Sequence, residues 1–482
     1  MDELILDILK QLRDGSQGAL DTHQLEMLIN SYNSGIDSSA HSTEREKLIP
    51  KRAILPYFLQ VKQNNDELWQ SWNVTPELEE RFIRSVRMKP RRTASGVATI
   101  TVITRPHTCS SNCIYCPCDL RMPKSYLANE PACQRAELTF FDPYVQVAAR
   151  LQALHQMGHS TDKVELIVLG GTWSDYPESY QYWFIKELFR ALNEWPNAPS
   201  HIQERLDWYT SFGLQNSDEA LSSFVAKQQA AVFEDAATYN QAFHKLYDTS
   251  QPHQSAWSKM QSTYDELVEQ QHVNETAAAR VVGLVIETRP DTITPDNLRM
   301  FRQLGCTKIQ IGIQSTRQEI LDANKRQMSA AQIKRAFSLI RLYGFKIHSH
   351  LMVNLLGATP EADKQDFKTF VTDPGFLPDE IKLYPCALVA GTQLVQKYRE
   401  GAWQPYAKDE LVDVLVQDVL TTPPYVRISR MIRDISATDI LVGNKHTNLR
   451  QMVEQKLTSE DVASRVQEIR FREINQQQVR AA

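Results

Sequence analysis

Four cysteines lie within ten residues of the sequence, although the chain of 482 residues has only seven. Cys109, Cys113 and Cys116 follow the spacing C-x3-C-x2-C, and Cys118 is a fourth thiol close by. Thiolates are soft ligands that iron–sulfur clusters favour, and a cluster with three protein ligands leaves one iron open to another molecule. The spacing therefore indicates an iron–sulfur cluster held by Cys109, Cys113 and Cys116.

Two other interpretations of the cysteines stay open at this point. A structural zinc ion uses four closed ligands, typically two separated pairs or a set with histidine, and Cys118 or Cys133 could supply the fourth. The thiols could also be free. Closely spaced cysteines in a reducing compartment favour metal binding over disulfides.

The composition is that of a globular protein, with 42% hydrophobic and 23% charged residues. No apolar run is long enough to span a bilayer, and the start "MDELILDILKQL" lacks the basic region of a secretory signal. We expect a cytoplasmic protein that does not contact membranes. The net charge of −5 argues against a surface coated by nucleic acid but permits a local basic patch.

The cysteine loop follows the first of six segments with strand character, and these segments alternate with helical ones. Such alternation predicts a parallel α/β sheet, and six units form a partial (β/α)6 barrel because a closed barrel needs eight. Active sites of these sheets lie at the carboxyl ends of the strands, where the cysteine loop begins. The expected strands are residues 96–104, 163–171, 281–289, 307–315, 345–357 and 379–385.

Four regions follow from the patterning along the chain. Residues 1–95 read as an N-terminal helical, basic region, and residues 96–424 contain the barrel. Residues 195–275 interrupt the barrel as a helical insertion, which we interpret as a passive surface excursion rather than a lid. Residues 425–482 form a C-terminal helical extension.

Polar residues share one face of the last four strands, because successive side chains of a strand point to opposite sides. If helices cover the apolar face, the polar face lines the barrel interior, either as ligand contacts or as a polar network without a ligand. We expect ligand contacts at Glu287, Arg289 and Gln314. The other residues on this face are Gln310, His348, His350, Met352, Asn354, Lys382 and Tyr384.

The cysteine spacing after the first strand resembles the radical S-adenosylmethionine superfamily. That resemblance implies a [4Fe–4S] cluster whose unique iron chelates S-adenosylmethionine, and reductive cleavage to a 5′-deoxyadenosyl radical that abstracts hydrogen from the substrate. Tyr115 between the last two cysteines fits this pattern. Gly170, Gly171 and Thr172 would border the cofactor, since bare glycine backbone can approach a ligand closely.

Further motifs resemble the catalytic subunit of the Elongator complex and its single-chain bacterial and archaeal relatives. They include "RMKPRRTASGVATITVITRPHTC", "MPKSYLANEPACQRA", "ETRPD", "GCTKIQIGIQS" and "EIKLYP". The resemblance implies an acyltransferase-class radical enzyme that forms a carboxymethyl-type group at C5 of the wobble uridine of tRNA, with acetyl-CoA as the carbon source. Glu287, Arg289 and Gln314 would then bind the cofactor, and the catalytic candidates are Lys124, Tyr126, His350, Lys382 and Tyr384.

A basic run at the end of the helical region is the candidate contact for the anticodon loop of tRNA, because phosphate contacts supply affinity that does not depend on sequence. A solvated helix face is the alternative. Arg427, Arg430 and Arg433 form a second, weaker basic set, and Lys124 and Tyr126 could contact the anticodon strand or the acyl donor. The run comprises Arg81, Arg84, Arg87, Lys89, Arg91 and Arg92.

The sequence departs from this family near its end. Relatives continue into an acetyltransferase-type domain, whereas this sequence stops at Ala482, and "SRVQEIRFREINQQ" has no cysteine for the zinc site found there in relatives. We expect either a truncated product or a radical domain that takes its acyl donor site in trans, from an acetyltransferase domain or Elongator-like subunits. The alternative function is a non-catalytic tRNA-binding or assembly subunit with a structural iron–sulfur cluster.

Overall fold

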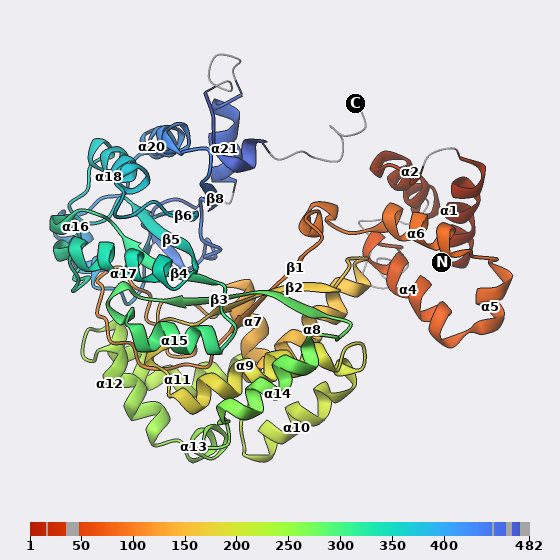
Figure 1. Ribbon diagram of the computed structural model, residues 1–482, viewed down its shortest axis with the longest axis horizontal. Helices are drawn as coiled ribbons and strands as arrows, with labels where there is room; N and C mark the ends of the chain where they lie inside the picture. Colours follow the sequence, from red (N-terminus) through yellow and green to blue (C-terminus); the bar gives the residue numbers. More distant parts are fainter. Residues whose placement is uncertain (16–17, 35–47, 446–447, 459–464, 473–482) are drawn as a thin grey trace.

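A seven-stranded parallel sheet forms the centre of the protein (Figure 1). The computed structural model describes residues 1–15, 18–34, 48–445, 448–458 and 465–472. Every strand pairs in parallel with its neighbours, in the order β1-β2-β3-β4-β5-β6-β8. The strands are β1 (Ala98–Ile103), β2 (Lys163–Leu169), β3 (Arg280–Thr288), β4 (Lys308–Gln314), β5 (Lys346–Val353), β6 (Glu380–Pro385) and β8 (Arg427–Arg430).

The six expected strands are all present, and the partial-barrel fold class is confirmed. The sheet has one strand more than the sequence predicted, because β8 belongs to the segment that we assigned to the C-terminal extension. β8 has four residues, too few to show a period of two, and it joins the sheet beside β6, where Ile428 lies opposite Ile381. β1 and β8 are therefore the two edges of the curled sheet.

Helices lie around the outside of the sheet and cover its apolar face (Figure 1). Ile309, Ile311 and Ile313 of β4 are fully buried in this layer, as the strand alternation predicted. Asp142 caps one of these helices by accepting a hydrogen bond of 2.9 Å from the Val145 backbone. The helices are α8 (Pro143–Gln156), α9 (Glu178–Asn193), α15 (Pro295–Gln303), α16 (Gln318–Ala323), α17 (Ala330–Leu342), α18 (Pro360–Thr372) and α20 (Lys408–Thr421).

The N-terminal helices stand beside the sheet and have a hydrophobic cluster of their own (Figure 1). In this cluster Phe58 stacks on Phe82 with ring centroids 4.1 Å apart. A short 3-10 helix, η1 (Pro90–Thr93), leads from the last of them into β1. The helices are α1 (Asp2–Asp14), α2 (Thr22–Asn33), α4 (Lys51–Asn64), α5 (Asp66–Ser71) and α6 (Pro76–Val86).

The insertion between β2 and β3 is helical, and its last helix packs against α9. An aromatic group that includes Tyr247 and Trp257, with ring centroids 5.0 Å apart, holds its middle together. Its elements are η3 (Ala198–His201), α10 (Ile202–Ser211), α11 (Asp218–Phe233), α12 (Tyr239–Phe243), the π-helix η4 (His244–Asp248), α13 (Gln251–Trp257) and α14 (Tyr264–Asn274).

Shorter elements complete the fold around the rim of the sheet. Among the residues that the structure describes, no helix combines the length and the apolar character needed to cross a membrane. The remaining elements are α7 (Pro131–Leu138), η2 (Trp173–Asp175), η5 (Pro290–Thr292), β7 (Leu388–Val389), α19 (Leu394–Arg399), β9 (Ile440–Val442), α21 (Leu449–Lys456) and η6 (Ile469–Arg472).

A buried carboxyl group without a partner lies in the outer layer. Asp418 on α20 is 1% exposed, and neither of its carboxyl oxygens has a hydrogen-bond partner among the described residues. Burial, reinforced by the nearby Asp363 and Asp366, raises the pKa of Asp418 well above its usual range. The folded state thus keeps a proton that the unfolded chain releases, so stability falls as pH rises above the ordinary aspartate pKa of about 4.

We expect the Asp418→Leu variant to be more stable than the wild type at neutral and alkaline pH. The gain should be about 1–3 kcal/mol, since a buried polar group without a partner is removed. Asp413→Leu is the matched control on the same helix, because Asp413 is exposed and pairs with Lys364 at 2.6 Å. Thermal melts at mildly acidic and at alkaline pH measure the stability of both variants. An equal change in stability for Asp418→Leu and Asp413→Leu would contradict this account.

Candidate active site

A cavity of about 600 Å³ fills the space inside the curled sheet. Its wall is closed on one side by the loop that follows β1 and by the segment that follows β8. The polar strand faces predicted from alternation do line it, so the interior of the half-barrel is a polar cavity. One residue from each strand in sheet order is Thr101, Glu165, Glu287, Gln310, His350, Lys382 and Arg430.

Three of the four clustered cysteines line this cavity, namely Cys109, Cys113 and Cys116. Cys118 is not part of the cavity wall. Its thiol donates to the Cys116 carbonyl at 3.2 Å, and its side chain packs against the aromatic group of the insertion. Cys133 reaches the cavity from α7. In the described part of the chain no three His, Cys, Asp or Glu side chains converge on a point that could hold one metal ion.

Arg326 and Ser111 contact the Cys113 thiol directly. Arg326 Nη1 donates to Cys113 Sγ at 3.2 Å, and Ser111 Oγ lies 2.9 Å from the same sulfur. Burial opposes ionisation, but the guanidinium and the serine outweigh it and lower the pKa of the Cys113 thiol to about 7. Lys124 supports the loop by donating from Nζ to the Ser111 carbonyl at 2.8 Å.

Four buried polar atoms in the cavity wall have no hydrogen-bond partner among the described residues. Buried polar atoms are rarely left without a partner, so this set indicates a ligand with both donors and acceptors. Gln314 has φ +73° and follows a register shift between β4 and β5, which turns its side chain away from the regular pattern. The atoms are Tyr115 Oη, Arg289 Nη1, Gln314 Oε1 and Arg326 Nε.

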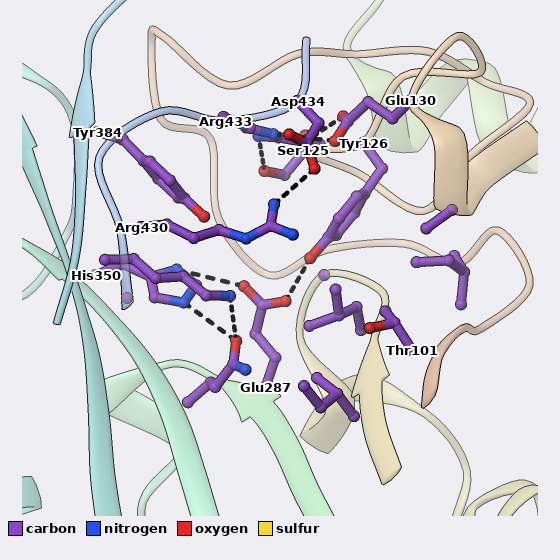
Figure 2. Close-up of a pocket in the computed structure, with 18 of the residues that line it drawn as sticks. Thr101, Ser125, Tyr126, Glu130, Glu287, His350, Tyr384, Arg430, Arg433 and Asp434 are labelled. Carbon is purple, nitrogen blue, oxygen red and sulfur yellow. Dashed lines mark hydrogen bonds and ion pairs between the residues drawn. The ribbon is translucent and has the colours of Figure 1, made fainter. Parts of the chain in front are cut away.

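A hydrogen-bonded network crosses the cavity beside these atoms (Figure 2). The Tyr126 hydroxyl donates to Glu287 Oε2 at 2.5 Å, and His350 Nδ1 lies 3.6 Å from Glu287 Oε1. Lys382 Nζ donates to Gln310 Oε1 at 2.7 Å, and His350 Nε2 lies 3.2 Å from the same oxygen. All the predicted catalytic candidates except Lys124 thus face one another across the cavity or border this network.

Burial sets the protonation of this network. It raises the pKa of Glu287 and lowers the pKa of Lys382 to about 8, partly offset by the attraction between the two groups. Burial together with the Lys382 charge also lowers the pKa of His350 well below its usual range, so this imidazole is neutral. A lysine whose pKa approaches neutrality can hold or release a proton under physiological conditions.

The segment after β8 closes the cavity through paired arginines (Figure 2). Arg433 forms an ion pair of 2.6 Å with Glu130, hydrogen-bonds Ser125, and stands over the Tyr126 ring at 5.0 Å. Arg430 pairs with Asp434 at 2.7 Å. Two members of the second basic set, Arg430 and Arg433, are therefore engaged with carboxylates.

Only part of the predicted glycine-rich edge borders the cavity. Gly171, with φ +83°, and Thr172 line the cavity, and Thr172 Oγ1 lies 3.7 Å from Cys109 Sγ. Gly170 does not line it. A Cβ at Gly170 would lie 1.7 Å from Thr104 Oγ1, so close packing against the residue that follows β1 explains this glycine rather than approach of a ligand.

Asn354 was expected on the cavity face of β5, and this expectation is wrong. The strand ends at Val353, and Asn354 has φ +63°, which breaks the alternation. Its side chain donates to the Gln404 carbonyl at 3.2 Å and accepts from the Tyr406 backbone at 3.0 Å, outside the cavity.

The basic run does not form one surface. Arg81 donates to the Gly15 carbonyl at 3.1 Å, and Arg84 pairs with Glu80 at 2.7 Å on the exposed face of α6. Arg87 is half-buried after this helix, Lys89 is exposed, and the side chain of Arg91 lies outside what the structure describes. Arg92 lines the cavity. The run thus changes from a solvated helix face to the cavity wall along its length.

The insertion holds the backbone of the cysteine loop, so its interpretation as a passive excursion is wrong. Asn240 accepts from the Cys109 amide at 3.1 Å and donates to the Cys109 carbonyl at 2.8 Å. Gln229 accepts from Leu120 N and donates to the Cys118 carbonyl, both at 2.9 Å. Tyrosine hydroxyls of the insertion add bonds of 2.7 Å to the carbonyls of Leu120 and Met122.

We expect the Asn240→Leu variant to loosen the cysteine loop without unfolding the chain. Both backbone groups of Cys109 lose their partner, which should cost about 1–3 kcal/mol locally. Hydrogen exchange of the loop peptide should accelerate several-fold, as protection reports local opening. Asn216→Leu is the matched control, since the side chain of this half-buried asparagine donates to the Leu138 carbonyl, away from the cysteine loop. Unchanged exchange at Cys109 in Asn240→Leu would contradict the assignment.

The sequence profile described as the radical SAM superfamily matches residues 255–369, and that of the Radical_SAM C-terminal domain matches residues 378–459. Neither match includes the cysteine loop. A solved structure of Elp3 from Methanocaldococcus infernus aligns with a TM-score of 0.54 and 30% identity, covering 76% of this chain and 64% of that one.

Curated relatives resemble the chain over most of its length. The tRNA uridine(34) acetyltransferase of Dehalococcoides mccartyi is 34% identical over 81% of this chain and 70% of its own length. The protein of the same name from Methanocaldococcus infernus is 33% identical over 83% of this chain, which spans 63% of that relative. Human Elongator complex protein 3 is 28% identical over 84% of this chain and 64% of its own length. The chain therefore belongs to the radical SAM family that comprises the tRNA uridine(34) acetyltransferases and Elongator complex protein 3.

Proposed function

We propose that this chain is a radical S-adenosylmethionine enzyme that forms a carboxymethyl-type group at C5 of the wobble uridine of tRNA. The observation that carries the proposal is the meeting of three cysteines and four polar atoms without partners in one cavity. The relatives' name, tRNA uridine(34) acetyltransferase, supports the substrate and suggests acetyl-CoA as the carbon source. The reaction belongs to the acyltransferase class on this proposal.

The residues present fit a [4Fe–4S] cluster better than a zinc ion. Each thiolate of a three-ligand cubane binds a different iron, whereas structural zinc draws four ligands to one point. Cys109, Cys113 and Cys116 face the cavity while Cys118 turns away, which matches three ligands and an open iron. Arg326 would donate a hydrogen bond to the Cys113 ligand and so help set the potential of the cluster.

The atoms without partners fit S-adenosylmethionine, which carries a carboxylate, an amino group and a ribose. Arg289 Nη1 and Arg326 Nε are free donors for the carboxylate, and Gln314 Oε1 is a free acceptor. Gly171 and Thr172 border the same space next to Cys109. When bound, the cluster and S-adenosylmethionine would together supply a carbon radical that abstracts hydrogen from an unactivated C–H bond.

The chain's own residues would bind, orient and shield the reactants. Glu287 is fixed by Tyr126 and can accept hydrogen bonds from the ribose or the uracil ring. Lys382, with its pKa lowered to about 8, can hold a proton near the uracil or the acyl group. The Arg433–Glu130 pair closes the wall and keeps water from the reaction space.

The test of the function is the product on tRNA. The anaerobically reconstituted chain is incubated with S-adenosylmethionine, reductant, acetyl-CoA and unmodified tRNA, with and without an added acetyltransferase-type domain. The tRNA is then digested to nucleosides for mass spectrometry. The proposal expects a carboxymethyl-type mass increase at uridine 34 only. An increase at another position, or none while S-adenosylmethionine is cleaved, would overturn the assigned substrate.

A further inference from the structure

Three arginines without carboxylate partners gather at one edge of the sheet. Arg92 comes from η1, Arg135 from α7 and Arg150 from α8, and all three elements pack against β1. No ion pair or side-chain hydrogen bond joins any of them to another described residue. We call Arg92, Arg135 and Arg150 the arginine triad.

The members of the triad lie close enough to repel one another. Burial and the charges of Arg135 and Arg92 lower the pKa of Arg150 to about 10, and Arg92 contributes to lowering the pKa of Arg135. An ionised Cys133 thiolate would stabilise the charge of Arg135. Burial raises the pKa of the Cys133 thiol, however, so that it stays neutral. Among the residues that the structure describes, no carboxylate therefore forms an ion pair with the triad.

The arginines that the β8 side contributes to the same cavity are paired. There Arg433 is paired with Glu130 at 2.6 Å and Arg430 with Asp434 at 2.7 Å. Arg430 and Arg433 of the β8 side are thus compensated, whereas Arg92 and Arg135, which line the same cavity from the β1 side, have no ion pair among the described residues. The contrast indicates that the β1 side leaves its positive charge for a ligand that arrives from outside.

The triad also lies where the cavity meets the solvent. β1 and β8 are the two sheet edges that do not pair with each other, so in the described structure no strand pairing closes the gap along β1, and the Arg433–Glu130 pair spans it beyond the carboxyl ends of the two strands. Arg92 and Arg135 line the cavity together with Thr99 and Thr101 of β1, and both arginine residues are exposed. A ligand can therefore enter the cavity in part while its charged portion stays at the triad.

A phosphodiester is the ligand that fits this arrangement. Guanidinium groups present planar forks of donors that match phosphate oxygens, and a polynucleotide carries such a phosphate next to every base. A base that reacts inside the cavity must be splayed out of its stack, while its backbone remains at the entrance. We propose that Arg92, Arg135 and Arg150 bind the RNA phosphate adjacent to the nucleotide that enters the cavity between β1 and β8. This inference rests on the proposed function and adds Arg135 and Arg150 to the RNA contacts.

The test measures binding of an anticodon stem–loop RNA to the full chain by fluorescence anisotropy over a range of salt concentrations. The variant is Arg135→Gln/Arg150→Gln. Its matched control is Arg335→Gln/Lys368→Gln, which removes two exposed cations from α17 and α18, outside the cavity wall. We expect the triad variant to bind about tenfold more weakly and its log–log salt slope to fall by about 0.7, the loss of one phosphate contact to a single strand. The control should bind as the wild type does.

A second variant separates the effect of charge on RNA binding from the effects of misfolding and of guanidinium geometry. Arg135→Lys/Arg150→Lys keeps the charge and loses the fork, so it should retain the salt slope and bind with intermediate affinity. Wild-type affinity and slope in Arg135→Gln/Arg150→Gln would overturn the inference and leave the proposed function intact. Equal weakening of the control pair would also overturn it, as would competition by polyglutamate at equal charge. Failure of the wild-type chain to bind the stem–loop would overturn both the inference and the proposed RNA substrate.

Discussion

The Cys113→Ala variant should carry no iron–sulfur cluster after anaerobic reconstitution. Cys113 faces the cavity and receives a hydrogen bond from Arg326, so its loss removes one of three ligands and leaves two on the loop. We expect loss of the broad visible absorbance of the cluster and of its iron and sulfide, with complete loss of S-adenosylmethionine cleavage. The small buried side chain itself contributes about 1 kcal/mol, so the fold and RNA binding should persist.

Cys118→Ala is the matched control for this prediction. Cys118 lies two residues beyond the last ligand, but its thiol bonds the Cys116 carbonyl and packs against the insertion. This variant should reconstitute the cluster and cleave S-adenosylmethionine as the wild type does. A requirement for Cys118 equal to that for Cys113 would indicate four ligands and contradict the three-cysteine site.

The Arg433→Met variant should lose about 3 kcal/mol of stability. Arg433 pairs with Glu130, whose side chain is 9% exposed. Removal of the guanidinium therefore leaves a buried carboxylate without its partner charge. It also releases Ser125 and the face of the Tyr126 ring, which loosens the cavity wall. Denaturant unfolding measures the loss, and cleavage of S-adenosylmethionine without substrate should increase as water enters.

Two further variants test whether the buried pair causes this effect. Arg430→Met removes a cavity arginine whose partner Asp434 is 56% exposed, so it should cost about 0.5 kcal/mol or less. Glu130→Leu/Arg433→Leu removes both charges and should recover much of the lost stability. Equal losses in Arg433→Met and Arg430→Met would show that pairing with Glu130 is not the cause.

The parts of the site that follow from strand periodicity could be predicted from the sequence. Glu287, Gln310, His350 and Lys382 each occupy the polar side of an alternating strand, and the period of two fixes which face they share. The same rule failed at Asn354, because the strand ends one residue earlier and the backbone turns to φ +63°. β8 was missed because four residues carry too little pattern.

Long-range contacts could not be predicted from one sequence. Arg326 lies 213 residues from Cys113, in a loop with no motif, and only folding brings its guanidinium to the thiol. Asn240 lies 131 residues from Cys109, within a segment whose composition suggested a passive surface helix. Gly170 was assigned to the cofactor because glycine permits close approach, but the close approach is to Thr104, the residue that follows β1. The glycine at position 170 correctly indicated that a side chain does not fit there, but only the fold shows that the neighbour is Thr104 and not a ligand.

The measurement that tests the central claim most directly is formation of 5′-deoxyadenosine. The chain is reconstituted with iron and sulfide under anaerobic conditions, reduced with S-adenosylmethionine, and assayed with and without tRNA and acetyl-CoA. We predict a brown protein whose cleavage of S-adenosylmethionine requires Cys109, Cys113 and Cys116 and is stimulated by tRNA. A brown protein without cleavage would instead indicate a structural cluster in a binding subunit. A colourless protein with stoichiometric zinc would contradict the account.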